Sequence, residues 1–219
     1  MCIIEPMRKI KFANHEFYHV YNRGVDHRQI TLSKQDSDRF VKSLVYFNSV
    51  RPIGSIAEFD RVKNETEQKP LVKLIAYCLN PNHFHLILEQ LVERGVSNYV
   101  KSLAGGFTKY FNARHKRTGG LLQGPFKAKH IDDNSYLLHL SAYVNLNNHI
   151  HKIGNPVSDF VRSSWDEYRG KKATCLCNND IVMSQFKTTR EYEIYALETL
   201  PAMLSKRADY KELEHLMFD

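Results

Sequence analysis

The stretch Leu71–Gln90, LVKLIAYCLNPNHFHLILEQ, decides the fold because it contains two apolar segments joined by a short turn. Leu71–Leu79 and His83–Gln90 have the composition of buried strands, and Asn80-Pro81-Asn82 between them has turn chemistry. The pattern predicts a β-hairpin at the centre of a sheet.

The segments on either side of this hairpin extend it to a βαββαβ order followed by a further helix. Before it, Glu16–Asn22 is predicted as a strand and Ser33 as the N-cap of a helix over 34–48. After it, a helix is expected over 96–116, a short strand over 124–131, and a helix over 135–151 that Asn134 caps. We therefore predict an α+β fold with a ferredoxin-like antiparallel sheet and helices on one face.

The helical and strand patterns weaken toward the C-terminus. We predict one domain over residues 1–155 and a partly helical C-terminal extension over 156–219. The whole chain has 219 residues, which is long enough to bury a substantial core.

Composition narrows the class of protein. Lys and Arg number 31 against 24 Asp and Glu, and this net charge of +7 favours a polyanionic partner. The four cysteines form no C-x-x-C pair, which indicates a reducing cytoplasm rather than a disulfide framework. No run approaches the roughly 20 apolar residues of a membrane span. A cytoplasmic protein without a membrane partner is expected.

The histidines of the hairpin have two interpretations. His83 and His85 are expected on one strand face, spaced to share a metal ion. With 11 histidines in the chain, however, chance alone gives about half an H-x-H motif. A second such motif, at His149 and His151, ends a predicted helix, where residues i and i+2 point in nearly opposite directions.

The last predicted helix supplies further polar groups on one stripe. Tyr143 and Asn147 are four residues apart and share a helix face, and His139 extends that face by one turn. Packing in the core would equally explain Tyr143, and fraying near the end of the helix would explain Asn147. The same face would also provide a nucleophile and an oxygen ligand.

Several motifs together resemble a known family, the single-tyrosine transposases of the IS200-like (HUH) type, and within it the REP-associated tyrosine transposase group. The resemblance covers about residues 10–170. Its motifs are YHVYNRG at 18–24, PNHFHL at 81–86, LQGPF at 122–126, YVNLN at 143–147, and Trp165 with Tyr168. The sequence departs from the family at Asn148, where proline is usual, and at Leu122-Gln123, where an aromatic–glutamine pair is common.

The resemblance implies a metal-dependent enzyme that cleaves and rejoins single-stranded DNA. It implies that His83, His85 and Asn147 bind the metal and that Tyr143 forms a 5′-phosphotyrosine. Ligand preference alone leaves zinc open, whereas the resemblance implies Mg²⁺ or Mn²⁺. It further implies hairpin-forming, REP-like DNA as the partner. It leaves open whether the protein is a monomer or a homodimer. His139 is a candidate helper in activating the tyrosine.

Basic residues are expected to bind the DNA backbone, with Tyr110, Phe111 and Phe126 available for base stacking. The candidates are Arg23, Lys109, Arg114, Arg117, Lys127 and Lys129. The same pattern would also arise if the basic side chains formed a solvated surface and the aromatic side chains belonged to the core.

Two other functions are alternative interpretations of the same residues. One is a non-catalytic, domesticated protein that binds DNA hairpins without cutting them. The other is a hydrolytic nuclease, which would place an acid near the metal. Glu89 shares the expected face of His85, but about 13 Å along the strand, too far to join the metal.

Overall fold

The computed structural model describes residues 10–51, 69–151, 157–172 and 176–205. Its strands are β1 (Phe17–Arg23), β2 (Val72–Leu79), β3 (His83–Gln90), β4 (Lys127–Ile131) and β5 (Arg162–Ser163). Its α-helices are α1 (Lys34–Tyr46), α3 (Gly95–Arg114), α4 (Asn134–Asn145), α5 (Asn147–Ile150), α6 (Trp165–Tyr168), α7 (Asp180–Met183) and α8 (Thr189–Ser205). Two 3-10 helices are η1 (Val25–His27) and η2 (Val157–Phe160).

The strands form one antiparallel sheet in the order β4-β1-β3-β2-β5. The first four reproduce the ferredoxin-like order, so the predicted α+β fold is confirmed. The fifth strand was not predicted, because two residues are too few to show an alternating pattern. It pairs with the end of β2, next to the hairpin turn.

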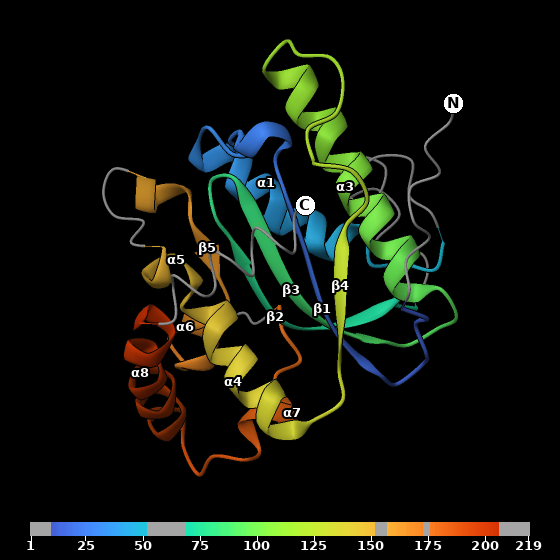
Figure 1. Ribbon diagram of the computed structural model, residues 1–219. Helices are drawn as coiled ribbons and strands as arrows, with labels where there is room; N and C mark the ends of the chain where they lie inside the picture. Colours follow the sequence, from blue (N-terminus) through green and yellow to red (C-terminus); the bar gives the residue numbers. More distant parts are fainter. Residues whose placement is uncertain (1–9, 52–68, 152–156, 173–175, 206–219) are drawn as a thin grey trace.

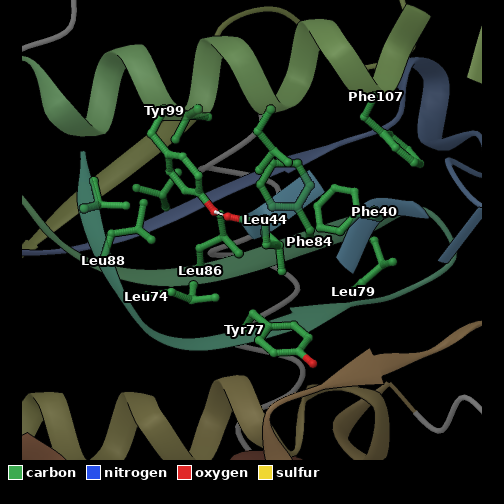
Figure 2. Packing of buried hydrophobic residues seen from close by; sticks show 14 of the residues in the cluster. Phe40, Leu44, Leu74, Tyr77, Leu79, Phe84, Leu86, Leu88, Tyr99 and Phe107 are labelled. Carbon is green, nitrogen blue, oxygen red and sulfur yellow. Dashed lines mark hydrogen bonds between the residues drawn. The ribbon is translucent and has the colours of Figure 1, made fainter. Parts of the chain in front are cut away.

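One face of the sheet is covered by α1 and α3 (Figure 1). Apolar side chains of β3, among them Phe84 and Leu86, pack there against both helices. Figure 2 shows this cluster, in which the buried Tyr99 hydroxyl donates to the Leu44 carbonyl at 2.9 Å. Tyr99 therefore ties α3 to α1 without leaving a polar group unpaired.

The other face of the sheet packs against α4, and α8 lies beside α4 (Figure 1). Ile87 of β3 and Val144 of α4 share one apolar cluster with Tyr192 and Ala196 of α8. The expected division at residue 155 falls outside the described residues. Within the residues that the structure describes, no helix is long and apolar enough to cross a bilayer.

Two local predictions about helix ends were wrong. The helix expected over 135–151 is broken at Leu146, whose φ of −103° and ψ of 12° lie outside the helical range, so it forms α4 and α5. Its cap is Asp133 instead of Asn134, because the Asp133 carboxylate accepts from the Tyr136 N–H at 2.7 Å. Ser33 caps α1 as predicted.

A buried carboxylate joins the start of α1 to the end of α3. Asp36 accepts hydrogen bonds from Leu32 N–H at 2.9 Å, Ser33 Oγ at 3.0 Å and His115 Nε2 at 3.1 Å. The Arg114 guanidinium lies 3.3 Å away. Burial opposes ionisation, but these hydrogen bonds outweigh it and hold the pKa of Asp36 below its ordinary value.

Candidate functional site

The register of the sheet gathers polar side chains on the face that α4 covers. Directly paired residues of antiparallel strands point to the same face. Three rows therefore cross this face: Arg23 beside His83; Lys127, Tyr21 and His85; and Lys129, His19 and Ile87.

His83 is a neutral imidazole at the start of β3. Burial lowers its pKa to about 3, and His151 contributes to the shift. Its Nδ1 lies 2.7 Å from Asn82 Oδ1, which accepts only, so Nδ1 carries the proton and Nε2 keeps a lone pair. The neutral tautomer fixes Nε2 as the atom that can bind a cation.

Asn147 Oδ1 lies 3.1 Å from His83 Nε2, so two electron-rich atoms face each other inside the protein. Asn147 is fully buried. The Asn80 side-chain amide donates to both atoms, at 2.9 Å to His83 and 2.6 Å to Asn147. The two acceptors lie about as far apart as neighbouring ligands of one small cation do.

His85 lies beside this group and pairs with a histidine of β1. Its Nδ1 is 2.9 Å from His19 Nε2, and both rings are buried. Burial lowers the pKa of His19 to about 3 and that of His85 well below the usual value. His85 Nε2 is buried and has no hydrogen-bond partner among the described residues. A buried acceptor is tolerated better than a buried orphan donor, so Nδ1–H donating to His19 is the favoured arrangement.

Tyr143 of α4 lies edge-on to both of these histidines. Its ring centroid is 5.6 Å from that of His85 and 6.5 Å from that of His19, and the side chain is 8% exposed. Asn147 follows in α5, beyond the break at Leu146. The predicted grouping of tyrosine and asparagine beside the two histidines is thus what the geometry shows. His139 lies in α4, one turn before Tyr143 and partly exposed; its helper role stays a prediction.

A buried polar network holds α4 in place from the C-terminal side. Asn145 Nδ2 donates to the Tyr192 hydroxyl of α8 at 2.9 Å, and the Ser141 hydroxyl is 3.0 Å from the same oxygen. The Ser164 hydroxyl donates to Asn145 Oδ1 at 2.6 Å. The helix that carries Tyr143 is therefore held in place by Ser164 and by Tyr192 of α8, both of which come later in the chain.

Three residues of this site were not predicted from the sequence: His19, Asn80 and His151. The His151 ring lies 4.9 Å from the His83 ring, while His149 is exposed, so the second H-x-H motif does point in two directions as expected. Strand alternation along EFYHVYN is a signal that puts His19 and Tyr21 on one face, but only the pairing of β1 with β3 shows that this face is that of His85.

The basic candidates divide between two faces of the protein. Arg23, Lys127 and Lys129 lie on the His83 face, and the charge of Lys129 helps to lower the pKa of His19. Lys109 and Arg114 lie on α3 and line an open cleft of about 950 Å³. Arg117 donates to Asn112 Oδ1 at 2.9 Å.

The aromatic candidates are less exposed than the stacking hypothesis requires. Phe111 is 2% exposed and belongs to the core, so the proposal that it stacks on bases was wrong. Phe126 and Tyr110 are partly buried against the same cluster.

The donor set fits a divalent cation held by imidazole and amide groups. Among the described residues, no three His, Cys, Asp or Glu side chains are arranged as a metal site. The fit rests on the facing lone pairs of His83 and Asn147 and on the orphaned Nε2 of His85. The Glu89 carboxylate is paired with Lys73 at 3.0 Å and with His15 at 3.5 Å.

Comparison with known proteins bears on the family and on the fold. Residues 54–147 match the family model described as "Transposase IS200 like". No curated protein is significantly similar in sequence. The structure of a REP-associated tyrosine transposase bound to a REP hairpin superposes with a TM-score of 0.56 at 15% identity, covering 79% of this chain and 90% of that one. At this identity the similarity shows a shared fold.

A second solved structure is a candidate transposase from Deinococcus radiodurans R1. It is 14% identical and covers 67% of this chain and 97% of its own. Its TM-score of 0.37 is too low to define a common fold.

Proposed function

Because residues 54–147 match the IS200-like transposase family model, we propose that this protein cleaves and rejoins single-stranded DNA through a 5′-phosphotyrosine at Tyr143. The observation that carries the proposal is the convergence of His83 Nε2 and Asn147 Oδ1, 3.1 Å apart, beside a tyrosine that packs on His85. Hairpin-forming DNA is the proposed substrate.

The proposed reaction exchanges one phosphodiester bond for another. The Tyr143 oxygen attacks the scissile phosphorus, the bond to the 3′ oxygen breaks, and a free 3′-hydroxyl leaves with a proton. Attack by a 3′-hydroxyl on the phosphotyrosine reverses the step, so the strand is rejoined without an external energy source.

The cation that the fold family implies is Mg²⁺ or Mn²⁺, held by His83, His85 and Asn147. When bound, it would stabilise the negative charge that develops on the scissile phosphate. The chain contributes neutral ligands, because burial disfavours the charged imidazolium form of both histidines. A free phenol has a pKa near 10, so the tyrosine also needs a proton acceptor, and His139 is our candidate.

A covalent-trapping assay tests the proposal. The full chain is mixed with a library of single-stranded hairpin oligonucleotides and Mg²⁺ or Mn²⁺, and the products are separated on a denaturing gel. A 3′-end label should move to protein mass, while a 5′-end label stays on a free fragment with a 3′-hydroxyl. Chelator should abolish both products.

The other outcomes of this assay identify the competing functions. Cut DNA without an adduct would show a hydrolytic nuclease. Binding without cutting, at every hairpin and metal tried, would show a non-catalytic hairpin-binding protein.

We expect His19 to position His85 for the cation. His19→Ala removes the acceptor of the His85 Nδ1 proton and should weaken Mn²⁺ binding about 10- to 100-fold, as loss of an outer hydrogen bond to a ligand does. His19→Gln supplies a side-chain oxygen and should restore part of that affinity. Titration followed by Mn²⁺ electron paramagnetic resonance (EPR) measures it.

His130→Ala is the matched control, since this histidine binds the exposed Glu16 at the sheet edge. Equal losses in His19→Ala and His19→Gln would show that His19 acts through packing alone.

We expect the two lysines of β4 to contact the DNA backbone near Tyr143. Replacing Lys127 and Lys129 together with alanine should lower the slope of log affinity against log salt by about 1.4, since each contact to a single strand contributes about 0.7. It should also reduce adduct formation at limiting DNA. Fluorescence anisotropy at several salt concentrations gives the slope.

One further double variant and one single variant locate the contacts. Lys101 and Lys109 line the α3 cleft, on the other face of the sheet, so their replacement should lower affinity but leave adduct yield at saturating DNA unchanged. Lys187→Ala, at an exposed position before α8, controls for net charge. A salt slope that is unchanged in the β4 variant would exclude that strand from the interface.

A further inference from the structure

Asn80, the residue that follows β2, is fully buried, and a buried side-chain amide is costly unless it is hydrogen-bonded. Its backbone N–H closes the hairpin by donating to the His83 carbonyl at 2.8 Å. Its side chain is not required for that bond. The side chain instead contacts the two groups that face each other in the site, His83 Nε2 and Asn147 Oδ1.

The two ends of the Asn80 amide are unequally satisfied. Nδ2 donates one hydrogen to each acceptor, at 2.9 and 2.6 Å. Oδ1, a strong acceptor, takes only a weak bond from the Cys78 thiol at 3.7 Å among the described residues. A buried amide oxygen with so weak a partner costs free energy. Turning the amide over exchanges the oxygen and nitrogen positions with almost no change in shape.

The spacing of the three atoms matches one face of an octahedral cation site. The atoms Asn80 Nδ2, His83 Nε2 and Asn147 Oδ1 are separated by 2.6, 2.9 and 3.1 Å. Neighbouring ligands of Mg²⁺, at 2.0–2.1 Å from the metal in octahedral geometry, are about 2.9 Å apart. If the amide turned over, Oδ1 would take the position that Nδ2 holds, at the spacing of a third ligand.

We propose that Asn80 is a further ligand of the cation: without metal its amide nitrogen bridges His83 and Asn147, and with metal the amide turns so that Oδ1 binds the ion. The inference rests on the cation of the proposed function. It adds an oxygen donor to the set and suits a hard ion such as Mg²⁺ or Mn²⁺ better than zinc.

Mn²⁺ affinity of Asn80 variants tests the proposal, measured on the full chain by the EPR signal of free Mn²⁺. Asn80→Asp replaces an amide oxygen with a carboxylate oxygen and should tighten binding at least tenfold. Asn80→Leu removes the ligand at similar volume and should weaken binding at least tenfold. Asn98→Asp, an exposed position on α3, adds the same charge far from the site and should change affinity less than twofold.

The sign of the Asn80→Asp effect separates a ligand from a structural donor. If Asn80 is only a hydrogen-bond donor, the aspartate places a third acceptor beside those of His83 and Asn147. Mn²⁺ affinity is then unchanged or falls, and this result would overturn the proposal. Thermal unfolding gives a second readout. Asn80→Asp should be less stable than the natural chain without Mn²⁺ and should gain more stability when Mn²⁺ is added.

The outcome is distinguishable from failure of the proposed function. Absence of Mn²⁺ binding by both the natural chain and Asn80→Asp would also overturn the inference. The covalent adduct at Tyr143 is assayed separately. An adduct in the natural chain together with unchanged Mn²⁺ affinity in Asn80→Asp would reject Asn80 alone.

Discussion

Tyr143→Phe should eliminate the covalent protein–DNA adduct and lower the rate of strand cleavage by about four orders of magnitude or more. The substitution removes the attacking oxygen and leaves the ring that packs edge-on to His85, so the fold and the cation site should be retained. Loss of a nucleophile commonly costs this much, because its partner groups cannot act without it. Single-turnover cleavage of a 3′-labelled hairpin measures the rate.

Tyr195→Phe is the control for this variant. Tyr195 lies in α8 against Phe186 and Tyr192, partly buried and outside the site. Its phenylalanine variant should cleave at the natural rate. An adduct that survives in Tyr143→Phe would assign the attack to another side chain.

Asp36→Ala should lower the free energy of unfolding by about 3 to 5 kcal/mol, the usual cost of leaving a buried ion pair without one partner. The variant leaves the Leu32 N–H, the Ser33 hydroxyl and the His115 ring without their acceptor. For a chain of this size, the fall in Tm is on the order of 10 °C. Urea titration and calorimetry measure the two quantities.

The matched control is Asp38→Ala, two residues later in the same helix. Asp38 pairs with Arg162 at 2.8 Å, but its side chain is 47% exposed, so the loss should not exceed about 1 kcal/mol. Equal losses in the two variants would show that the Asp36 cluster adds nothing beyond a surface ion pair.

Acid should destabilise the protein partly through Asp36. Its folded-state pKa is below the unfolded value of about 3.9, so its contribution is complete above that value and is lost as pH falls through the folded pKa. Asp36→Asn cannot titrate, and its stability should therefore depend less on pH below about 4. A dependence as steep as that of the natural chain would assign the acid sensitivity to other carboxylates.

Local patterns were sufficient for the hairpin and for its two histidines. The second strand of the hairpin, β3, was predicted over His83–Gln90 and is found with those bounds. Apolar composition and turn chemistry are both properties of a few neighbouring residues, so the sequence alone reveals them. The Ser33 cap was predicted for the same reason. The stripe of Tyr143 and Asn147 gave the correct grouping even though the helix is broken between them.

The rest of the site depends on which strands pair and in what register, and no local pattern carries that information. His19 meets His85 because β1 lies between β3 and β4. Asn80 was read as a turn residue, and its side-chain role appears only when α5 brings Asn147 against it. The lysines of α3 and β4 are near in sequence but lie on opposite faces of the sheet.

The hydrogen bonds that Tyr192 and Ser164 make to α4 determine how accurately Tyr143 is positioned. Apolar surfaces allow a helix to slide along its neighbour, and a slip of one turn moves every side chain by about 5.4 Å. Attack on a phosphate tolerates an error of only about 1 Å. Hydrogen bonds are directional, and the Asn145 side chain is bonded to Tyr192 on one side and to Ser164 on the other. These bonds fix the position of α4 along its axis and therefore the position of Tyr143 relative to the histidines.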